Sequence, residues 1–296
     1  MTKRRNIIRG LVVFLFLGIA FGLMAYPFIA NYVFENRADS IVSTIEQSAQ
    51  DANTEEYEEA IAQAVEYNET LANGHIQLKD PFSEEALDEA AGDYGTLLCM
   101  TDDGVMGFIE IPSIDVSLPI YHGTSADVLE RGVGHLEGTS LPVGGESTHS
   151  VLTGHSGLSN AKLFTDLTEL VKNDVFFLHI MGEMLAYQVD QIKVVLPSEL
   201  NDLYIESGKD YCTLITCTPY GVNTHRLLVR GVRTDYEEVV SNPETFEVKK
   251  VESKWMAEYQ RALLISLVFL AVCMSVVLIR RRHLSRKASD VVDDFC

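Results

Sequence analysis

Two uncharged apolar runs, one near each end of the chain, place the strongest constraint on how this sequence can fold. The first run extends from Gly10 to Ala30 and the second from Ala262 to Ile279. Each has about the length that an α-helix needs to cross the hydrocarbon core of a bilayer. A cleaved signal peptide is the alternative for the first run, but the run is long for one and no small-x-small site follows it. The sequence therefore predicts two transmembrane helices.

Basic residues flank each run on the side of the nearer terminus: Lys3, Arg4, Arg5, Arg9, Arg280, Arg281, Arg282, Arg286 and Lys287. Because positively charged flanks stay on the cytoplasmic side, we expect both termini in the cytoplasm and the middle of the chain outside the cell. The expected order is a cytoplasmic N-terminus (1–9), a transmembrane anchor (10–30), a helical segment (31–105), a β domain (106–236), a juxtamembrane linker (237–261), a second span (262–279) and a cytoplasmic tail (280–296).

The composition of the middle segment excludes some functions. The 296 residues carry a formal net charge of −20, and the acidic residues are concentrated between the two runs. An acidic surface repels phosphate, so nucleic-acid binding is not expected. The five cysteines, at 99, 212, 217, 273 and 296, have no paired metal-ligand spacing and form no disulfide framework. We expect neither a metal nor a cofactor.

Two helices and a loop are predicted before the β domain. Residues 37–72 lack Gly and Pro, and apolar positions recur at helical spacing, with Asn53 and Glu56 as a capping box for the second helix and Asn73-Gly74 as its end. On sequence alone, a spacer between membrane and domain is the favoured interpretation. Asp80-Pro81-Phe82 predicts an extended loop, and Ser83 begins another short helix that ends near Gly92.

From Gly107 onwards the sequence changes to short alternating strands separated by turns, which indicates a closed or nearly closed all-β barrel with small inserted helices. Strands are predicted at Phe108–Ile111, Val116–Tyr121, Ser150–Thr153, Val175–Ile180, Leu185–Val195, Tyr211–Thr216 and Arg226–Val232, and helices at Ser125–Gly132 and Lys162–Leu170.

A cysteine and an arginine lie at the ends of the last two strands. Cys217 stands where one strand ends and Arg226 where the next begins, on either side of a turn-forming segment. A thiol beside a fixed cation is a plausible nucleophile, because positive charge favours the thiolate. Cys212 lies five residues earlier and points to the opposite face, so it cannot pair with Cys217. A buried structural cysteine is the alternative interpretation.

Histidine 155 is the favoured base for such a nucleophile. His155 stands at a strand end close to two glycines, the same kind of position as Cys217. His225 is adjacent to Arg226 in a strand and therefore points to the other face. His179 lies inside an apolar strand and is better explained by packing. The remaining candidates in the middle segment are His75, His122, His135 and His149.

The motifs around these three residues together resemble the sortases, which are membrane-anchored cysteine transpeptidases of Gram-positive bacteria. They are TLITCTP around Cys217, NTHRLLVRG around Arg226 and TGHSG around His155. Other segments resemble the class C, pilus-assembling branch: MGFIEIPSIDVSLPIYHGTS, VGHLEGTSLPVGG, AKLFTDL, VDQIKVVLP, EYNETLAN and the tripeptide Asp80-Pro81-Phe82. One departure is Ser156, where the family more often has arginine.

This resemblance implies an eight-stranded sortase β-barrel and a set of residue roles. Cys217 would attack the Thr–Gly carbonyl of an LPXTG-type sorting signal, with His155 as general acid and base and Arg226 stabilising the oxyanion or orienting the substrate. A lysine amine of a pilin subunit would resolve the thioacyl enzyme. Asp80, Pro81 and Phe82 would form a lid in which Asp80 reaches Arg226 and Phe82 covers Cys217.

Other functions and partners are also considered. The alternatives are a sortase that anchors proteins to cell-wall peptide, a catalytically silent surface binding module on the same fold, and a hydrolytic cysteine protease. The expected partners are LPXTG-bearing pilin subunits with their acceptor lysines and the lipid bilayer, with a further contact to the secretion machinery. The expected location is the cell membrane, with two spans and an extracellular catalytic domain.

Overall fold

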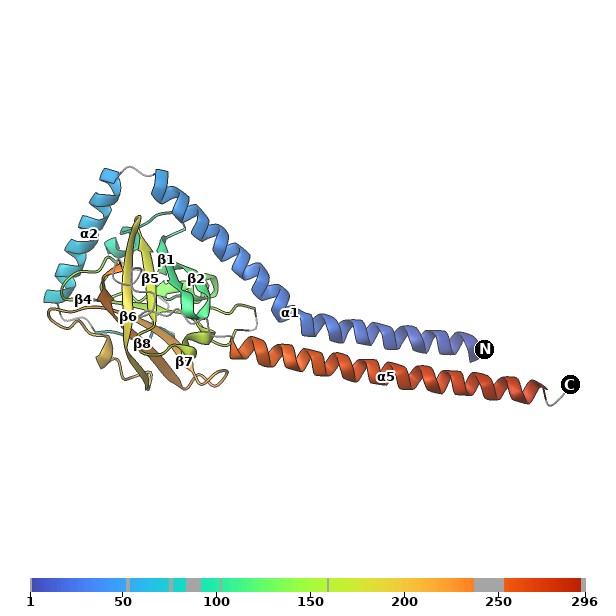
Figure 1. The fold of residues 1–296 in the computed structure, drawn as a ribbon. Helices are drawn as coiled ribbons and strands as arrows, with labels where there is room; N and C mark the ends of the chain where they lie inside the picture. The colour runs from blue at the N-terminus through green and yellow to red at the C-terminus, as the bar shows by residue number, and fades with distance from the viewer. Residues whose placement is uncertain are drawn as a thin grey trace. The chain divides into compact units, whose positions relative to one another are not determined.

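The computed structural model describes residues 2–51, 54–74, 77–83, 92–101, 103–158, 160–236 and 253–293. Its contacts divide the chain into two units, Met1–Val251 and Glu252–Cys296. The first unit contains two long helices and a β-barrel, and the second contains a single long helix (Figure 1). The predicted linker lies mostly outside the described residues, as do His75, Cys296 and most of the helix predicted after Ser83.

Eight strands form a closed barrel in the order β1-β2-β3-β4-β7-β8-β6-β5, which confirms the predicted fold class. The strands are β1 (Val105–Ile111), β2 (Val116–His122), β3 (Val133–His135), β4 (Thr148–Thr153), β5 (Val175–Ile180), β6 (Glu183–Val195), β7 (Asp210–Thr218) and β8 (His225–Thr234). The barrel leaves no open sheet edge, because β5 pairs with both β1 and β6.

The strand directions define two ends of the barrel. One end carries the β1–β2 turn, the connection after β4 and the β7–β8 turn, because β4 is parallel to β7 while β1 and β2, and β7 and β8, are antiparallel. We call it the Cys217 end. The other carries the β5–β6 turn at Met181-Gly182 and the starts of β4 and β7, and we call it the Gly182 end.

Short elements around the barrel agree only partly with the sequence pattern. Helix α3 (Ala126–Arg131) forms as predicted, and the Ser125 hydroxyl accepts a hydrogen bond from the Val128 amide at its N-terminus. The helix predicted at Lys162–Leu170 is wrong: only the 3-10 helix η4 (Thr165–Glu169) forms there. The reason is that Leu163 has a left-handed backbone, with φ of 41°, which interrupts a right-handed helix.

The barrel interior is the main hydrophobic core. Alternate residues of every strand point inwards, and Leu152, Phe176, Tyr187 and Leu214 are among the fully buried members. Burying one such aliphatic side chain contributes roughly 1.5–3 kcal/mol. Cys212 belongs to this interior cluster, so Cys217, five residues along the same strand, faces the outside of the barrel wall as predicted.

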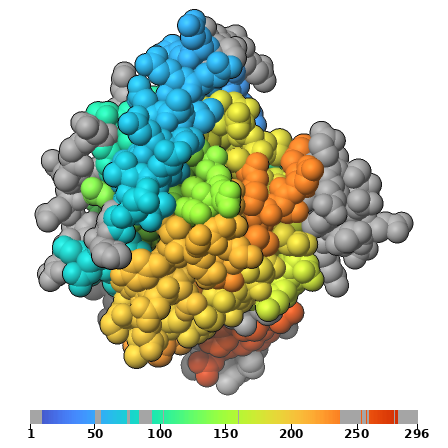
Figure 2. All heavy atoms as spheres, turned by 90° about the vertical axis from the view of Figure 1, so that its left-hand side faces the viewer, coloured from blue at the N-terminus to red at the C-terminus, as the bar shows by residue number. Residues whose placement is uncertain are grey.

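Helices α1 (Thr2–Asp51) and α2 (Thr54–Asn73) pack against the barrel and are more than a spacer. The face of α1 that carries Val42 and Ile45 packs on β1 and β2. In α2, Ala64 and Asn68 are buried, and α2 lies across the barrel surface in Figure 2. The spacer interpretation is therefore wrong, because the apolar stripe of the second helix has a partner.

Two helices are long and apolar enough to cross a membrane. The corresponding segments are Gly10–Ala49 in α1 and Tyr259–Val277 in α5 (Lys254–Asp293). Their apolar side chains, such as Phe14 and Phe269, are exposed in the structure. Exposed apolar stretches of this length are typical of helices that a membrane covers.

Candidate active site

Cys217 and Arg226 are direct partners in the antiparallel pair of β7 and β8. Strand β7 continues to Thr218, two residues further than predicted, so both residues lie within regular strands. Residues that face each other across an antiparallel pair project from the same side of the sheet. Both residues are 7% exposed. The thiol and the guanidinium therefore share one sheltered site at the Cys217 end of the barrel.

His155 is held next to this site by its connection to β4. Thr153 pairs with Ile215 in parallel strands, and the Gly154 amide continues the pairing by donating to the Ile215 carbonyl at 3.0 Å. The positions two residues further along, His155 and Cys217, are therefore neighbours at the same end of the barrel. Gly154 is required here, because a Cβ atom would lie 2.6 Å from the Phe164 ring.

The residues around His155 fix its loop to the barrel. The Phe164 amide donates to the His155 carbonyl at 3.0 Å, and the Thr216 hydroxyl donates to the Gly154 carbonyl at 2.7 Å. Ser156 donates from its hydroxyl to the Cys217 carbonyl at 3.0 Å. This last contact links the loop directly to the cysteine, and no sequence motif indicated it.

The Asp80–Phe82 segment covers the site. Asp80 accepts two hydrogen bonds from Arg226, from Nε at 2.8 Å and from Nη2 at 2.7 Å. The Phe82 ring lies 4.9 Å from the Arg226 guanidinium carbon and 5.6 Å from the His155 ring. Pro81 is buried, and Leu78 packs into a hydrophobic cluster on the barrel wall. The resemblance implied the contact between Asp80 and Arg226, whereas the cover of Phe82 over Cys217 stays a prediction, because the ring contacts of Phe82 are with Arg226 and His155.

Burial shifts the pKa values of both candidate catalytic groups, Cys217 and His155. Burial raises the pKa of the Cys217 thiol; Arg226 opposes the shift and Asp80 adds to it. Burial lowers the pKa of His155, and Glu130 partly opposes that shift. Both shifts favour the uncharged form. Burial therefore favours the neutral thiol and the neutral imidazole over an ion pair.

The other described histidines lie elsewhere. His225 is bonded to the Thr224 hydroxyl on the opposite face from Arg226, and His179 stacks on Phe108 at 4.1 Å between ring centroids. Three more histidines of the first unit are held by hydrogen bonds to backbone or neighbouring side chains: His122, His135 and His149. Among the described residues, His155 is the histidine that contacts the covering segment next to Cys217.

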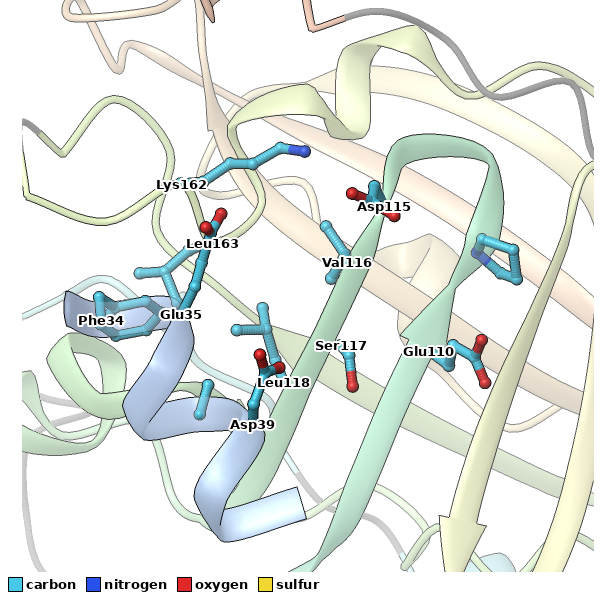
Figure 3. Close-up of a pocket in the computed structure, with 12 residues that line it drawn as sticks. Phe34, Glu35, Asp39, Glu110, Asp115, Val116, Ser117, Leu118, Lys162 and Leu163 are labelled. Atoms are coloured by element: carbon cyan, nitrogen blue, oxygen red, sulfur yellow. The ribbon is translucent and has the colours of Figure 1, made fainter. Parts of the chain in front are cut away.

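A separate pocket of about 310 Å³ lies between α1 and the β1–β2 hairpin (Figure 3). Glu35 and Asp39 reach into it from α1, and Lys162 lies across its rim. The Lys162 ammonium donates to the Ile114 carbonyl and pairs with Asp166. Neither Cys217 nor His155 lines this pocket. Within the part of the chain that the structure describes, no cluster of side chains suits a metal ion.

Comparison with known proteins gives a consistent assignment. The family model described as the Sortase domain matches residues 109–234. Sortase C from Streptococcus pneumoniae superposes with a TM-score of 0.63 at 43% identity, covering 67% of this chain and 97% of that structure. This chain belongs to the sortase family. Sortase C-1 from Actinomyces oris, at 51% identity, TM-score 0.57, and 61% and 99% coverage, supports its assignment to the class C branch.

Curated sortases match over a shorter segment. Sortase D of Bacillus subtilis is 32% identical over 130 residues, which are 43% of this chain and 63% of the relative. Sortase A of Staphylococcus aureus is 32% identical over 124 residues, which are 40% of this chain and 58% of the relative. The matches to these two curated relatives thus cover less than two thirds of their length.

Proposed function

We propose that this sortase is a cysteine transpeptidase that cleaves LPXTG-type sorting signals between Thr and Gly and transfers the acyl group to a pilin lysine. The observation that carries the proposal is the pairing of Cys217 with Arg226 on neighbouring strands, with His155 at the adjacent strand end. The proposed roles are nucleophile for Cys217, general acid and base for His155, and oxyanion stabilisation or substrate orientation for Arg226.

In the first proposed step, the Cys217 sulfur attacks the Thr carbonyl carbon while its proton passes to His155. The carbonyl oxygen becomes an oxyanion, and the Arg226 guanidinium stabilises the developing charge. When the intermediate collapses, the Thr–Gly C–N bond breaks and His155 gives its proton to the departing Gly amine. The acyl group is then held as a thioester on Cys217.

In the second proposed step, a lysine amine of another subunit replaces the departed glycine. His155, now neutral again, accepts a proton from the amine as its nitrogen attacks the thioester carbonyl. The C–S bond breaks, the thiol is restored, and an isopeptide bond joins the two subunits. Dividing amide exchange into two steps uses only side chains of the protein.

The lid controls access to this chemistry. Asp80 occupies both Nε and Nη2 of Arg226, so the guanidinium cannot serve an oxyanion in the same geometry. The Phe82 ring lies against both Arg226 and His155. We therefore propose that the lid segment leaves the site before a sorting signal binds.

The proposed partners and location follow from the relatives and the two apolar helices. The S. pneumoniae sortase C structure is described in terms of pilin substrate specificity, and a group B streptococcal sortase C1, 44% identical with a TM-score of 0.62, belongs to a pilus island. We propose that residues 10–30 and 262–279 cross the cell membrane, with both termini cytoplasmic and the barrel outside. A contact with the secretion machinery fits this location.

Incubation of the full-length protein in detergent with an LPXTG peptide and a lysine-bearing pilin peptide tests the function. We expect an isopeptide-linked product and a thioacyl adduct on Cys217 by mass spectrometry, and no product from Cys217→Ala. Cys99→Ala is the matched control, since Cys99 is an exposed thiol. Hydrolysis without transfer would indicate a protease. No turnover, even in an open-lid Asp80→Ala background, would contradict the proposal.

A further inference from the structure

Followed from its N-terminus, helix α1 reaches the Cys217 end of the barrel before it reaches the Gly182 end. Asn31 lies one residue after the predicted span and is only 4% exposed. Its side-chain oxygen accepts a hydrogen bond of 2.7 Å from the backbone amide of Lys162. Lys162 belongs to the loop that begins at His155, and its ammonium donates to the Ile114 carbonyl in the β1–β2 turn. The point where α1 would leave a bilayer is therefore fixed to the Cys217 end.

The same helix reaches the Gly182 end about five turns later. A Cβ atom on Gly182, in the β5–β6 turn, would lie 3.8 Å from the Cβ atom of Ala49. Between these points, Val42 and Ile45 pack on β1 and β2, and α1 is one continuous helix. The 18 residues from Asn31 to Ala49 span about 27 Å at 1.5 Å per residue. The Cys217 end of the barrel thus lies nearer to the predicted span than the Gly182 end does.

Exposed apolar side chains gather at the Cys217 end. The β7–β8 turn, residues 219–224, contains no charged residue, and Tyr220 and Val222 in it are 53% and 63% exposed. Val194 and Leu196, at the end of β6 next to the start of β8, are 59% and 46% exposed. Aromatic and aliphatic side chains of this kind are favoured at the boundary between headgroups and hydrocarbon.

We infer that the Cys217 end of the barrel faces the membrane and that its β7–β8 turn contacts the lipid interface. The inference rests on the proposed crossing of the bilayer by residues 10–30. It assigns the turn a lipid surface as its partner. Bound substrates would then reach Cys217 from the narrow space between barrel and bilayer, where the sorting signals of membrane-held proteins lie.

Tryptophan quenching by brominated lipids tests the orientation directly. The sequence has a single tryptophan, Trp255, so Trp255→Phe gives a dark background for Val222→Trp and for the control Ser207→Trp. Both sites are exposed, and Ser207 precedes β7 at the Gly182 end. In phosphatidylcholine–phosphatidylglycerol vesicles with bromine on the acyl chains near the headgroup, we expect Val222→Trp to lose at least half of its fluorescence and Ser207→Trp to lose little. Equal quenching of both, or stronger quenching of Ser207→Trp, overturns the inference.

An activity measurement separates this inference from the proposed function. Val222→Asp places a charge in the turn without touching Cys217, His155 or Arg226. We expect its turnover of a soluble LPXTG peptide to match the parent and its turnover of a vesicle-anchored LPXTG peptide to fall several-fold. Equal rates on the anchored peptide contradict the inference alone. Failure of the parent protein on the soluble peptide contradicts the proposed function, whatever the quenching result.

Discussion

Arg226 is the residue on which the proposed mechanism depends, because Asp80 and the proposed oxyanion would compete for its guanidinium. In the structure its guanidinium forms a two-point contact with Asp80 while lying opposite Cys217. Charge-assisted, two-point pairs of this kind are stronger than single neutral hydrogen bonds. Burial raises the pKa of Cys217, the Arg226 charge opposes this shift, and the Asp80 charge adds to it. If the Asp80–Phe82 segment acts as the proposed lid, its closure favours the protonated thiol.

Replacing Asp80 should open the site and acidify the thiol together. With Asp80→Ala, we expect Cys217 to react with a thiol reagent about tenfold faster at neutral pH, which corresponds to about 1.4 kcal/mol. The pH midpoint of the labelling rate should also move down, because loss of burial and loss of the Asp80 charge both lower the pKa of Cys217.

Asp190→Ala is the matched control for this measurement. Arg230 lies four residues after Arg226 in β8. Asp190 accepts two hydrogen bonds from it, from Nε at 3.0 Å and from Nη2 at 2.7 Å, so the two pairs are equivalent. Its loss should leave the labelling rate of Cys217 unchanged. If both variants accelerate labelling equally, the effect is general loosening of the barrel wall and not removal of a lid.

His149 should make stability depend on pH. Burial lowers its pKa from 6.5 to about 4, with its ring between the Tyr204 carbonyl and the Thr213 hydroxyl. The unfolded chain therefore binds a proton that the folded chain does not, and stability is lost as pH falls from about 6.5 towards 4. The full shift corresponds to about 3 kcal/mol.

A comparison of thermal unfolding midpoints at pH 7 and pH 5 checks this dependence. His149→Asn should lower the midpoint at pH 7 but show a smaller further drop at pH 5 than the parent. His135, whose pKa burial also lowers to about 4, should account for part of the drop that remains. An identical pH-induced drop in parent and variant would rule out a contribution from His149.

At the scale of elements, α2 is joined to the barrel by a buried asparagine. The Asn68 side chain accepts from the Leu141 amide at 2.7 Å and donates to the Leu141 carbonyl at 3.1 Å. It thereby satisfies both backbone groups of one residue, as a neighbouring strand would. Leu71 is buried next to it, and Leu78 of the following segment packs on the barrel. The docking of α2 thus sets where the lid segment begins.

Removing this connection should be costly. Asn68→Leu leaves the buried Leu141 amide without its partner, which costs about 1–3 kcal/mol, while the Leu141 carbonyl still accepts a hydrogen bond from the Val143 amide at 2.8 Å. We expect a loss of stability of about 1–3 kcal/mol, measured by thermal unfolding, together with faster labelling of Cys217. Asn73→Leu is the control: Asn73 is exposed and bonds only within its own helix, so its midpoint should stay within a degree or two of the parent.

The elements also show where sequence patterns are insufficient. The long alternating strands and the end of α2 at Asn73 could be predicted, because their periodicity and turn residues are local. Strand β3 has three residues, Val133–His135, too few to show alternation. The failed helix at Lys162–Leu170 has helical composition, but the Lys162 amide bonds to Asn31, 131 positions away. Such long-range contacts decide local backbone geometry and leave no local signal.

At the scale of the whole molecule, the proposed topology predicts which cysteines are accessible from outside intact cells. Cys99 is exposed on the first unit and should react with a membrane-impermeant thiol reagent. Cys296, in the predicted cytoplasmic tail, should react only after the cells are permeabilised. The measurement compares labelling of Cys99→Ala and Cys296→Ser variants by mass spectrometry. Labelling of Cys296 in intact cells would contradict two crossings.

The residues of the site could be predicted from the sequence, but the pKa shifts and contacts that set their chemistry could not. Cys217, His155 and Arg226 could be named from their motifs, and the structure brings them to one end of the barrel. The directions of the pKa shifts of the thiol and the imidazole could not be predicted, since they depend on burial in the folded protein. The Ser156 contact with the Cys217 carbonyl likewise depends on how two strand ends meet.

If the Asp80–Phe82 segment acts as the proposed lid, it affects which substrates the enzyme accepts. Because Asp80 and Arg226 belong to one chain, the lid is a tethered competitor that dilution cannot remove. A substrate's apparent dissociation constant equals its intrinsic value divided by the fraction of open enzyme. If about one molecule in a hundred is open, every sorting signal binds about a hundredfold more weakly than the bare site would allow. Such an enzyme ignores dilute free peptides and responds to substrates that a shared membrane concentrates beside it.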